Sequence, residues 1–187
     1  SILAFSAINN NDKVGLILFT DRIELFIPPK KGRLHTLRLI REMLYFEPEG
    51  RGTDLAGALD YLNLVLSRRS VVFMISDFLA PDFTKALTVT SKRHDLVAMP
   101  VIDKGESELP NVGIITLEDA ETGEQIDVNT SSKAVRRALR EINEDRLADL
   151  EYLLRSRRVD IVRLSTNEDY LIPLRNFFEL RERRQAA

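Results

Sequence analysis

Short apolar segments separated by stretches of helical periodicity constrain the fold of this chain more than any other feature. The apolar segments span residues 14–20, 71–76, 95–102 and 159–165, and the helical patterns span residues 33–44, 54–66, 81–93 and 131–155. This alternation is typical of a parallel sheet covered by helices on both faces. We therefore expect a single α/β domain over residues 1–187.

Individual segments give more detailed expectations. "VGLILFT" (14–20) and "VVFMIS" (71–76) are apolar at nearly every position, which predicts strands buried on both faces. The alternating segment 23–27 predicts a hairpin partner nearer the sheet edge, ended by Pro28 and Pro29. Segments 112–119 and 124–130 predict a second hairpin. The helix over 33–44 should bury a stripe of apolar residues, namely Leu34, Leu37, Ile40, Met43 and Leu44.

Composition excludes several classes of protein. The 187 residues are 44% hydrophobic and 30% charged, with a formal net charge of -2 and no cysteine. The mixed charge gives no footprint for nucleic acid, and no apolar run is long enough to span a membrane. Without cysteine, disulfides and thiolate sites are excluded. We expect a cytoplasmic protein that neither binds nucleic acid nor inserts into a membrane.

The candidates for chemistry are few. Asp77 ends an expected buried strand at its carboxyl end, the edge where open α/β sheets bind ligands. Thr53 and Asp54 precede the expected helix that begins near residue 54. Each of the three residues has a simpler interpretation, in which its side chain caps a turn or a helix.

Together, several motifs resemble a known fold. "DKVGLILF", "RGTDL" and "ISDF" follow one another as in the von Willebrand factor A fold. With "RRS", "ELPNVG", "EDAETGE" and "STNEDYLIPL", the whole chain resembles more closely a bacterial family catalogued as domain of unknown function 58. The resemblance implies a doubly wound, mostly parallel sheet with a metal-ion-dependent adhesion site. That site would bind Mg²⁺ or Mn²⁺ through Thr53, Asp77 and an Asp-x-Ser-x-Ser element.

The Asp-x-Ser-x-Ser element is absent from the 187 residues, and the first segment, "SILAFSAINN", has the pattern of the end of a helix. We therefore expect a chain truncated at its N-terminus, without the central strand that the family places between 14–20 and 71–76. Unpaired strand edges associate readily. The two strands should either close up on each other or mediate self-association. The chain alone should bind Mg²⁺ or Mn²⁺ very weakly, because Thr53 and Asp77 provide too few ligands.

The resemblance implies a protein-interaction module that is not an enzyme and works with a protein partner. Relatives are associated with MoxR-type AAA+ ATPases, in the assembly or maturation of other proteins. Two alternatives remain open. One is a metal-assisted hydrolase that uses Asp77. Such an enzyme needs a nucleophile, a base or further carboxylates, and the sequence supplies only Asp21, in an expected hairpin turn. The other is a purely structural domain in which Thr53 and Asp77 are caps.

The remaining polar features favour simpler interpretations. His35 and His94 are too far apart in sequence for a local metal motif and are expected on the surface or in loops. The basic clusters at 155–158 and 181–184 fall at expected helix ends, where cations complement the helix dipole. A solvated surface is the default there, and a partner-binding surface is the alternative.

Overall fold

The computed structural model describes residues 3–4, 8, 10–103, 105, 110–118, 123 and 125–186. Most of the expected helix end before residue 10 lies outside the described residues. So do most of the connection 120–123, the first two residues of the "ELPNVG" motif and most of the "EDAETGE" motif. No helix within the described part of the chain is long and apolar enough to cross a bilayer.

The centre of the molecule is a parallel sheet, as predicted. Strands β3 (Val71–Ser76) and β4 (Asp95–Ile102) pair in parallel along their length, from Val71 opposite Asp95 to Ser76 opposite Pro100. On its other side β4 pairs with β7 (Asp160–Ile161) and β8 (Leu164–Ser165). The predicted strand 159–165 is therefore two short strands rather than one.

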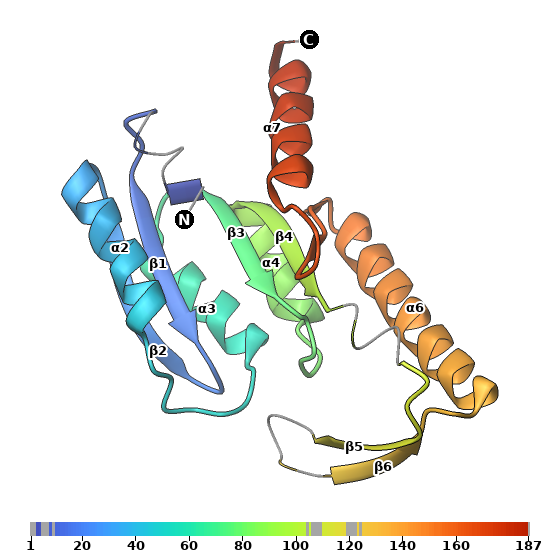
Figure 1. Ribbon diagram of the computed structural model, residues 1–187. Helices are drawn as coiled ribbons and strands as arrows, with labels where there is room; N and C mark the ends of the chain where they lie inside the picture. Colours follow the sequence, from blue (N-terminus) through green and yellow to red (C-terminus); the bar gives the residue numbers. More distant parts are fainter. Residues whose placement is uncertain are drawn as a thin grey trace.

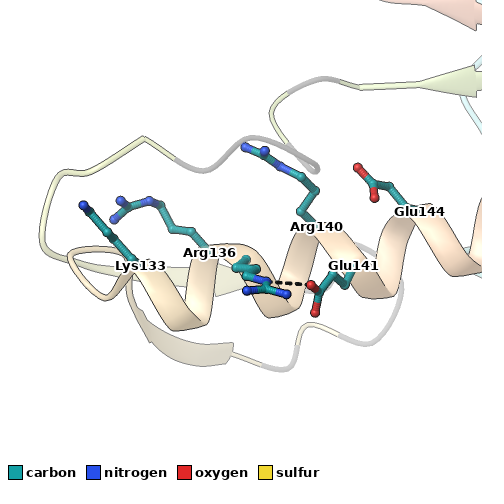
Figure 2. A pocket seen from close by; sticks show the side chains of 6 residues that line it. Lys133, Arg136, Arg140, Glu141 and Glu144 are labelled. Carbon is teal, nitrogen blue, oxygen red and sulfur yellow. Dashed lines mark hydrogen bonds and ion pairs between the residues drawn. The ribbon is translucent and has the colours of Figure 1, made fainter.

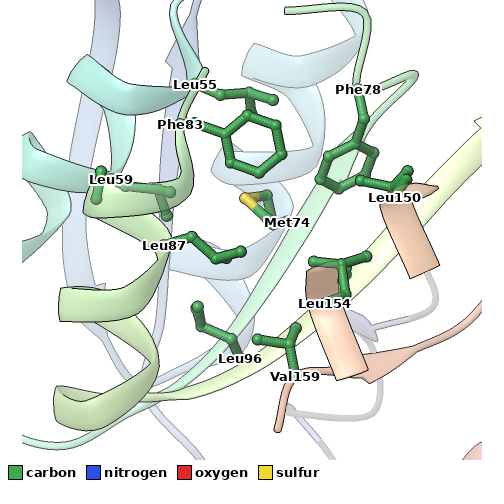
Figure 3. Packing of buried hydrophobic residues seen from close by; sticks show 12 residues of the cluster. Leu55, Leu59, Met74, Phe78, Phe83, Leu87, Leu96, Leu150, Leu154 and Val159 are labelled. Atoms are coloured by element: carbon green, nitrogen blue, oxygen red, sulfur yellow. The ribbon is translucent and has the colours of Figure 1, made fainter. Parts of the chain in front are cut away.

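Helices cover both faces of this sheet, because successive side chains of a strand point to opposite faces. On one face Met74, Leu96 and Ala98 pack against α3 (Leu55–Val65), α4 (Thr84–Arg93) and the end of α6 (Lys133–Ser156). Figure 3 shows this cluster. On the other face Val97 and Met99 pack against Leu174 of α7 (Leu171–Ala186). The predicted α/β architecture is confirmed at this level.

A second, smaller sheet lies beside the first. Strands β1 (Val14–Phe19) and β2 (Ile23–Lys30) form the predicted antiparallel hairpin, followed by α2 (Arg33–Tyr45). The prediction that Pro28 and Pro29 end the second strand is wrong, since β2 continues through both. Proline lacks an N–H donor, and an edge strand tolerates it because one side of the strand has no partner.

The burial predicted for this part of the chain is also wrong. β1 is only half-buried, and in β3 the side chains of Val71 and Ile75 are 52% and 53% exposed. In α2 the expected apolar stripe is mostly exposed, with Leu34 at 84%, whereas Thr36 and Leu39 are buried. A buried strand needs neighbours on both sides and both faces, and apolar composition alone does not provide them.

The facing edges of the two sheets explain this exposure. Among the described strands, β1 pairs only with β2, and β3 pairs only with β4. Figure 1 shows β1 and β3 running in the same direction, with their carboxyl ends at the same end of the molecule. The expectation that these two strands close up on each other is therefore not met.

A hairpin and the first half of α6 extend away from the sheets (Figure 1). Strands β5 (Ile114–Glu118) and β6 (Gln125–Asn129) pair antiparallel, as predicted. The helix α6 then begins after Ser132, whose hydroxyl accepts a hydrogen bond from the backbone N–H of Val135. Only its last turns, at Leu150 and Leu154, enter the core.

Candidate functional site

Three connecting segments converge at the carboxyl ends of β1 and β3. The backbone N–H of Asp54 donates to the carbonyl of Thr20, at 2.8 Å, which joins the loop before α3 to the turn after β1. Leu55, directly after that loop, shares a core cluster with Phe78, directly after β3 (Figure 3). Packing therefore brings the Thr53 segment and the Asp77 segment to the same edge of the structure.

The residues around Thr53 start a helix. Asp54 is the N-cap of α3, and its Oδ1 accepts a hydrogen bond from the backbone N–H of Gly57 at 2.8 Å. The capping interpretation is confirmed for Asp54. Thr53 is half-buried and directly precedes this N-cap residue.

Asp77 shapes a turn. Its Oδ1 accepts hydrogen bonds from the backbone N–H of Leu79 at 3.0 Å and from the hydroxyl of Ser76 at 3.3 Å. The next residue, Phe78, has a φ of 59° and a buried ring. A left-handed conformation is costly for a bulky residue, and burial of the ring offsets that cost. The Asp77 carboxylate is left exposed at the sheet edge.

The described residues by themselves do not fit a magnesium site. Mg²⁺ prefers about six oxygen ligands, whereas Thr53 and Asp77 provide one hydroxyl and one carboxylate. Within the described ranges no group of three or more acidic or histidine side chains is placed to hold a metal. Arg146 of α6 also donates to the backbone carbonyl of Asp77, at 3.3 Å. Its positive charge opposes a cation at this edge.

Glu24 of β2 was not singled out from the sequence. Its Oε1 accepts hydrogen bonds from the Gly50 N–H at 2.7 Å, the Thr20 hydroxyl at 2.8 Å and the Arg22 Nε at 3.4 Å. The Gly50 hydrogen bond, more than the other contacts, lowers the pKa of Glu24 from its usual range. The carboxylate therefore ties the loop before Thr53 to the first hairpin. The only feature of the sequence that could have indicated this role of Glu24 is its charged side chain in an otherwise apolar segment.

The two histidines differ from each other. His35 of α2 is half-buried, and its Nε2 lies 2.9 Å from the Val14 carbonyl. His94, which ends α4, is only 2% exposed. His94 does lie in a connection, between α4 and β4, but it is not on the surface, because the two elements join so closely that the ring is enclosed.

A basic surface lies on the first turns of α6 (Figure 2). Lys133, Arg136, Arg137 and Arg140 surround an open hollow of about 570 Å³ together with Glu141 and Glu144. Arg137 pairs with Glu141 at 2.7 Å, and Arg136 donates to the Thr130 carbonyl. Cations in a first helical turn are opposed by the helix dipole. The helix dipole therefore does not explain this cluster, which sequence reasoning overlooked.

Comparison with known proteins places the chain in a family. A 28% identical stretch of 184 residues covers 97% of this chain and 58% of an uncharacterized protein of Mycobacterium tuberculosis. A protein of Mycobacterium bovis matches to the same extent. An uncharacterized protein of Mycobacterium avium is 31% identical over 160 residues, which cover 84% of this chain and 94% of that protein.

The chain thus spans little more than half the length of the first of these relatives. No solved structure matches the chain. Residues 1–148 match the family described as "Protein of unknown function DUF58". Since this match covers well over half of the sequence, the chain belongs to the DUF58 family.

Proposed function

We propose that this chain is a protein-interaction module of the von Willebrand factor A type, which recognises its partner through a bound metal ion and is not an enzyme. One observation carries the proposal. Among the described strands, β1 and β3 are not paired with each other, and their carboxyl ends lie at the same end of the molecule (Figure 1). Leu55 and Phe78, which closely follow Thr53 and Asp77, belong to one core cluster. A strand inserted between β1 and β3 would join the two sheets into one, in the order β2, β1, inserted strand, β3, β4, β7.

The inserted strand would also complete the metal site. The loop at its carboxyl end would lie between Thr53 and Asp77 and would carry the Asp-x-Ser-x-Ser element, which this chain lacks. Three further oxygen side chains would bring Mg²⁺ or Mn²⁺ close to the coordination it prefers and would offset the charge of Arg146. A carboxylate of the partner protein would fill the remaining position. A MoxR-type AAA+ ATPase is the partner class that we propose.

A metal titration by calorimetry tests this proposal. We would compare the 187-residue chain with a longer chain, extended before Ser1 by a segment that carries the Asp-x-Ser-x-Ser element. The longer chain should bind Mn²⁺, Asp77→Asn should weaken the binding about tenfold or more, and the 187-residue chain should bind very weakly. Asparagine keeps an oxygen for the Leu79 hydrogen bond and so preserves the turn.

Asp82 provides a matched control. It lies in the same connection as Asp77, and its Oδ1 accepts a hydrogen bond from the Thr84 N–H at 2.9 Å. Asp82→Asn removes one negative charge five residues along the chain from Asp77, without removing a proposed ligand. Equal weakening by Asp77→Asn and Asp82→Asn, or no binding by the longer chain, would contradict the proposal.

A structural role is the second candidate, and the hydrogen bonds of Asp77 favour it. Oδ1 already stabilises the turn through Leu79, as a structural aspartate would. Under this alternative Asp77→Asn has little effect on any binding, and Asp77→Ala costs about 0.5 to 2 kcal/mol of stability. Urea unfolding of the two variants beside the titration separates the candidates.

A further inference from the structure

A second hollow, of about 410 Å³, lies at the amino end of β4, the opposite edge of the sheet from Asp77. It is formed where α4 ends, where α6 ends and where the chain enters β4 through His94 and Asp95. Its position separates it from the candidate metal edge. Its lining contains Ser156, Arg157 and Arg158 of the "RSRR" segment, whose interpretation the sequence left open between a solvated surface and a binding surface.

His94 is the first unusual feature of this hollow. Its side chain is almost completely buried, and neither Nδ1 nor Nε2 has a hydrogen-bond partner. Burial, followed by the charges of Arg93 and Arg69, lowers the pKa of His94. The ring is therefore neutral at physiological pH and has one N–H donor. A buried donor without an acceptor is unfavourable, so a native structure that keeps one calls for a specific explanation.

The charge of the lining is the second unusual feature. Its cations are Arg69, Lys92, Arg157 and Arg158, and its one carboxylate is Asp95. Asp95 is already paired with Arg181 of α7. The ends of α4 and α6 contribute about half a negative charge each, which balances about one of the four cations. A surplus of positive charge remains, although the whole chain carries a net charge of -2.

The two arginines after α6 are held in place. Arg157 donates from Nε to the hydroxyl of Thr88 at 2.8 Å and from Nη1 to the hydroxyl of Ser156 at 2.9 Å. Arg158 has a φ of 58°, at a position after a helix where glycine is usual. Its N–H donates to the Arg155 carbonyl at 3.0 Å. An arginine side chain is thus present at a backbone position where it is conformationally unfavourable.

We propose that this hollow binds a phosphate dianion, either free phosphate or a phosphate monoester. Guanidinium groups donate paired N–H bonds that match phosphate oxygens, and the lysine adds a point charge. His94 lines the hollow, so a phosphate oxygen there offers its N–H the acceptor that it lacks. Stabilisation of the helix ends explains each cation singly, but it explains neither their surplus nor the unpartnered imidazole.

NMR of the histidine rings tests the proposal directly, because the chain contains only His35 and His94. Sodium phosphate is titrated slightly above neutral pH, at constant ionic strength, against sodium chloride. The His94 ring signals should shift with saturation. The His35 signals should not move, since its Nε2 contacts the Val14 carbonyl outside the hollow. Phosphoserine, titrated in the same way, distinguishes the sources: tighter binding than phosphate identifies a monoester, and weaker binding identifies the free ion.

Two variants and a control complete the experiment. Arg157→Gln and Arg158→Gly should each weaken phosphate binding about tenfold or more, as expected for a charge-assisted hydrogen bond. Arg158→Gly also relieves the left-handed backbone, so its melting temperature should be maintained or raised. Arg155→Gln removes a cation from the same helix end, one that pairs with Glu151 at 3.6 Å and does not line the hollow. It should bind as the wild type does.

The contrary results are equally specific. A His94 signal that does not respond to phosphate, or that responds without saturation, overturns the proposal. Equal weakening by Arg155→Gln and Arg158→Gly also overturns it, because a general charge effect would then account for the binding.

Discussion

Strands β1 and β4 have similarly apolar sequences and very different surroundings. β4 has a strand on each side and helices over both faces, and Val97 and Ala98 are completely buried. β1 has a single strand partner among the described strands, and none of its residues is fully buried. The comparison shows that apolar composition predicts a strand, whereas the neighbours of that strand determine how much of it is buried.

The largest expected effect contrasts a leucine in each region. Leu87 of α4 is completely buried beneath the β3–β4 sheet, whereas Leu34 of α2 is 84% exposed. Leu87→Ala should lower the free energy of unfolding by about 2 to 5 kcal/mol, through lost burial and the cavity that remains. Leu34→Ala should change it by less than about 0.5 kcal/mol. Urea unfolding measures both, and similar losses would mean that α2 is covered in solution.

A smaller effect is expected where the two regions are joined. Asp54 caps α3, and its backbone N–H bonds to Thr20 of the first hairpin. Asp54→Ala removes the cap and should cost about 1 kcal/mol of stability. Asp60→Ala, at an exposed position further along α3, is the control and should cost less. Thermal unfolding compares them, and an equal loss in both variants would argue against a capping role.

The smallest effect is a pH dependence in the first hairpin. Hydrogen bonds, above all from Gly50, lower the folded-state pKa of Glu24 below its ordinary value of 4.5. The ionised Glu24 carboxylate therefore stabilises the fold at pH values above 4.5, and this stabilisation is lost as the pH falls through the lower, folded-state pKa. Glu24→Gln should flatten the loss of stability in acid.

Glu49→Gln is the matched control for Glu24, because Glu49 pairs with the same Arg22, at 3.1 Å, and is exposed. Stability curves from mildly acidic pH downward compare the two variants. If the free energy of unfolding of Glu24→Gln falls with decreasing pH as steeply as that of the wild type, the hydrogen bonds of this carboxylate do not stabilise the contact between the loop and the hairpin.

Sequence patterns predicted most of the elements, because their signals are local. The limits of β3 and β4, the antiparallel pairing of β1 with β2 and the helix that follows Asp54 all depend on periodicity, turns and caps within about a dozen residues. Which side of α2 is buried depends on contacts with distant segments, so the predicted Leu34 stripe failed. The continuation of β2 through Pro28 and Pro29 depends on its edge position, which the local sequence does not specify.

The candidate site was predictable to a similar degree. The resemblance proposed Thr53 and Asp77, and Leu55 and Phe78 from the same two segments share a core cluster. The network of Glu24 and the enclosure of His94 were missed. Both depend on backbone groups and side chains far away in the sequence, for which residue spacing gives no signal.

The length of α6 has a mechanical consequence. Its 24 residues span about 36 Å, at about 1.5 Å per residue. Only the turns with Leu150 and Leu154 are anchored in the core, while the opposite end adjoins the β5–β6 hairpin. A displacement of the hairpin would therefore be carried along the helix to its anchored end at Leu154, three residues before Arg157 of the hollow at the amino end of β4.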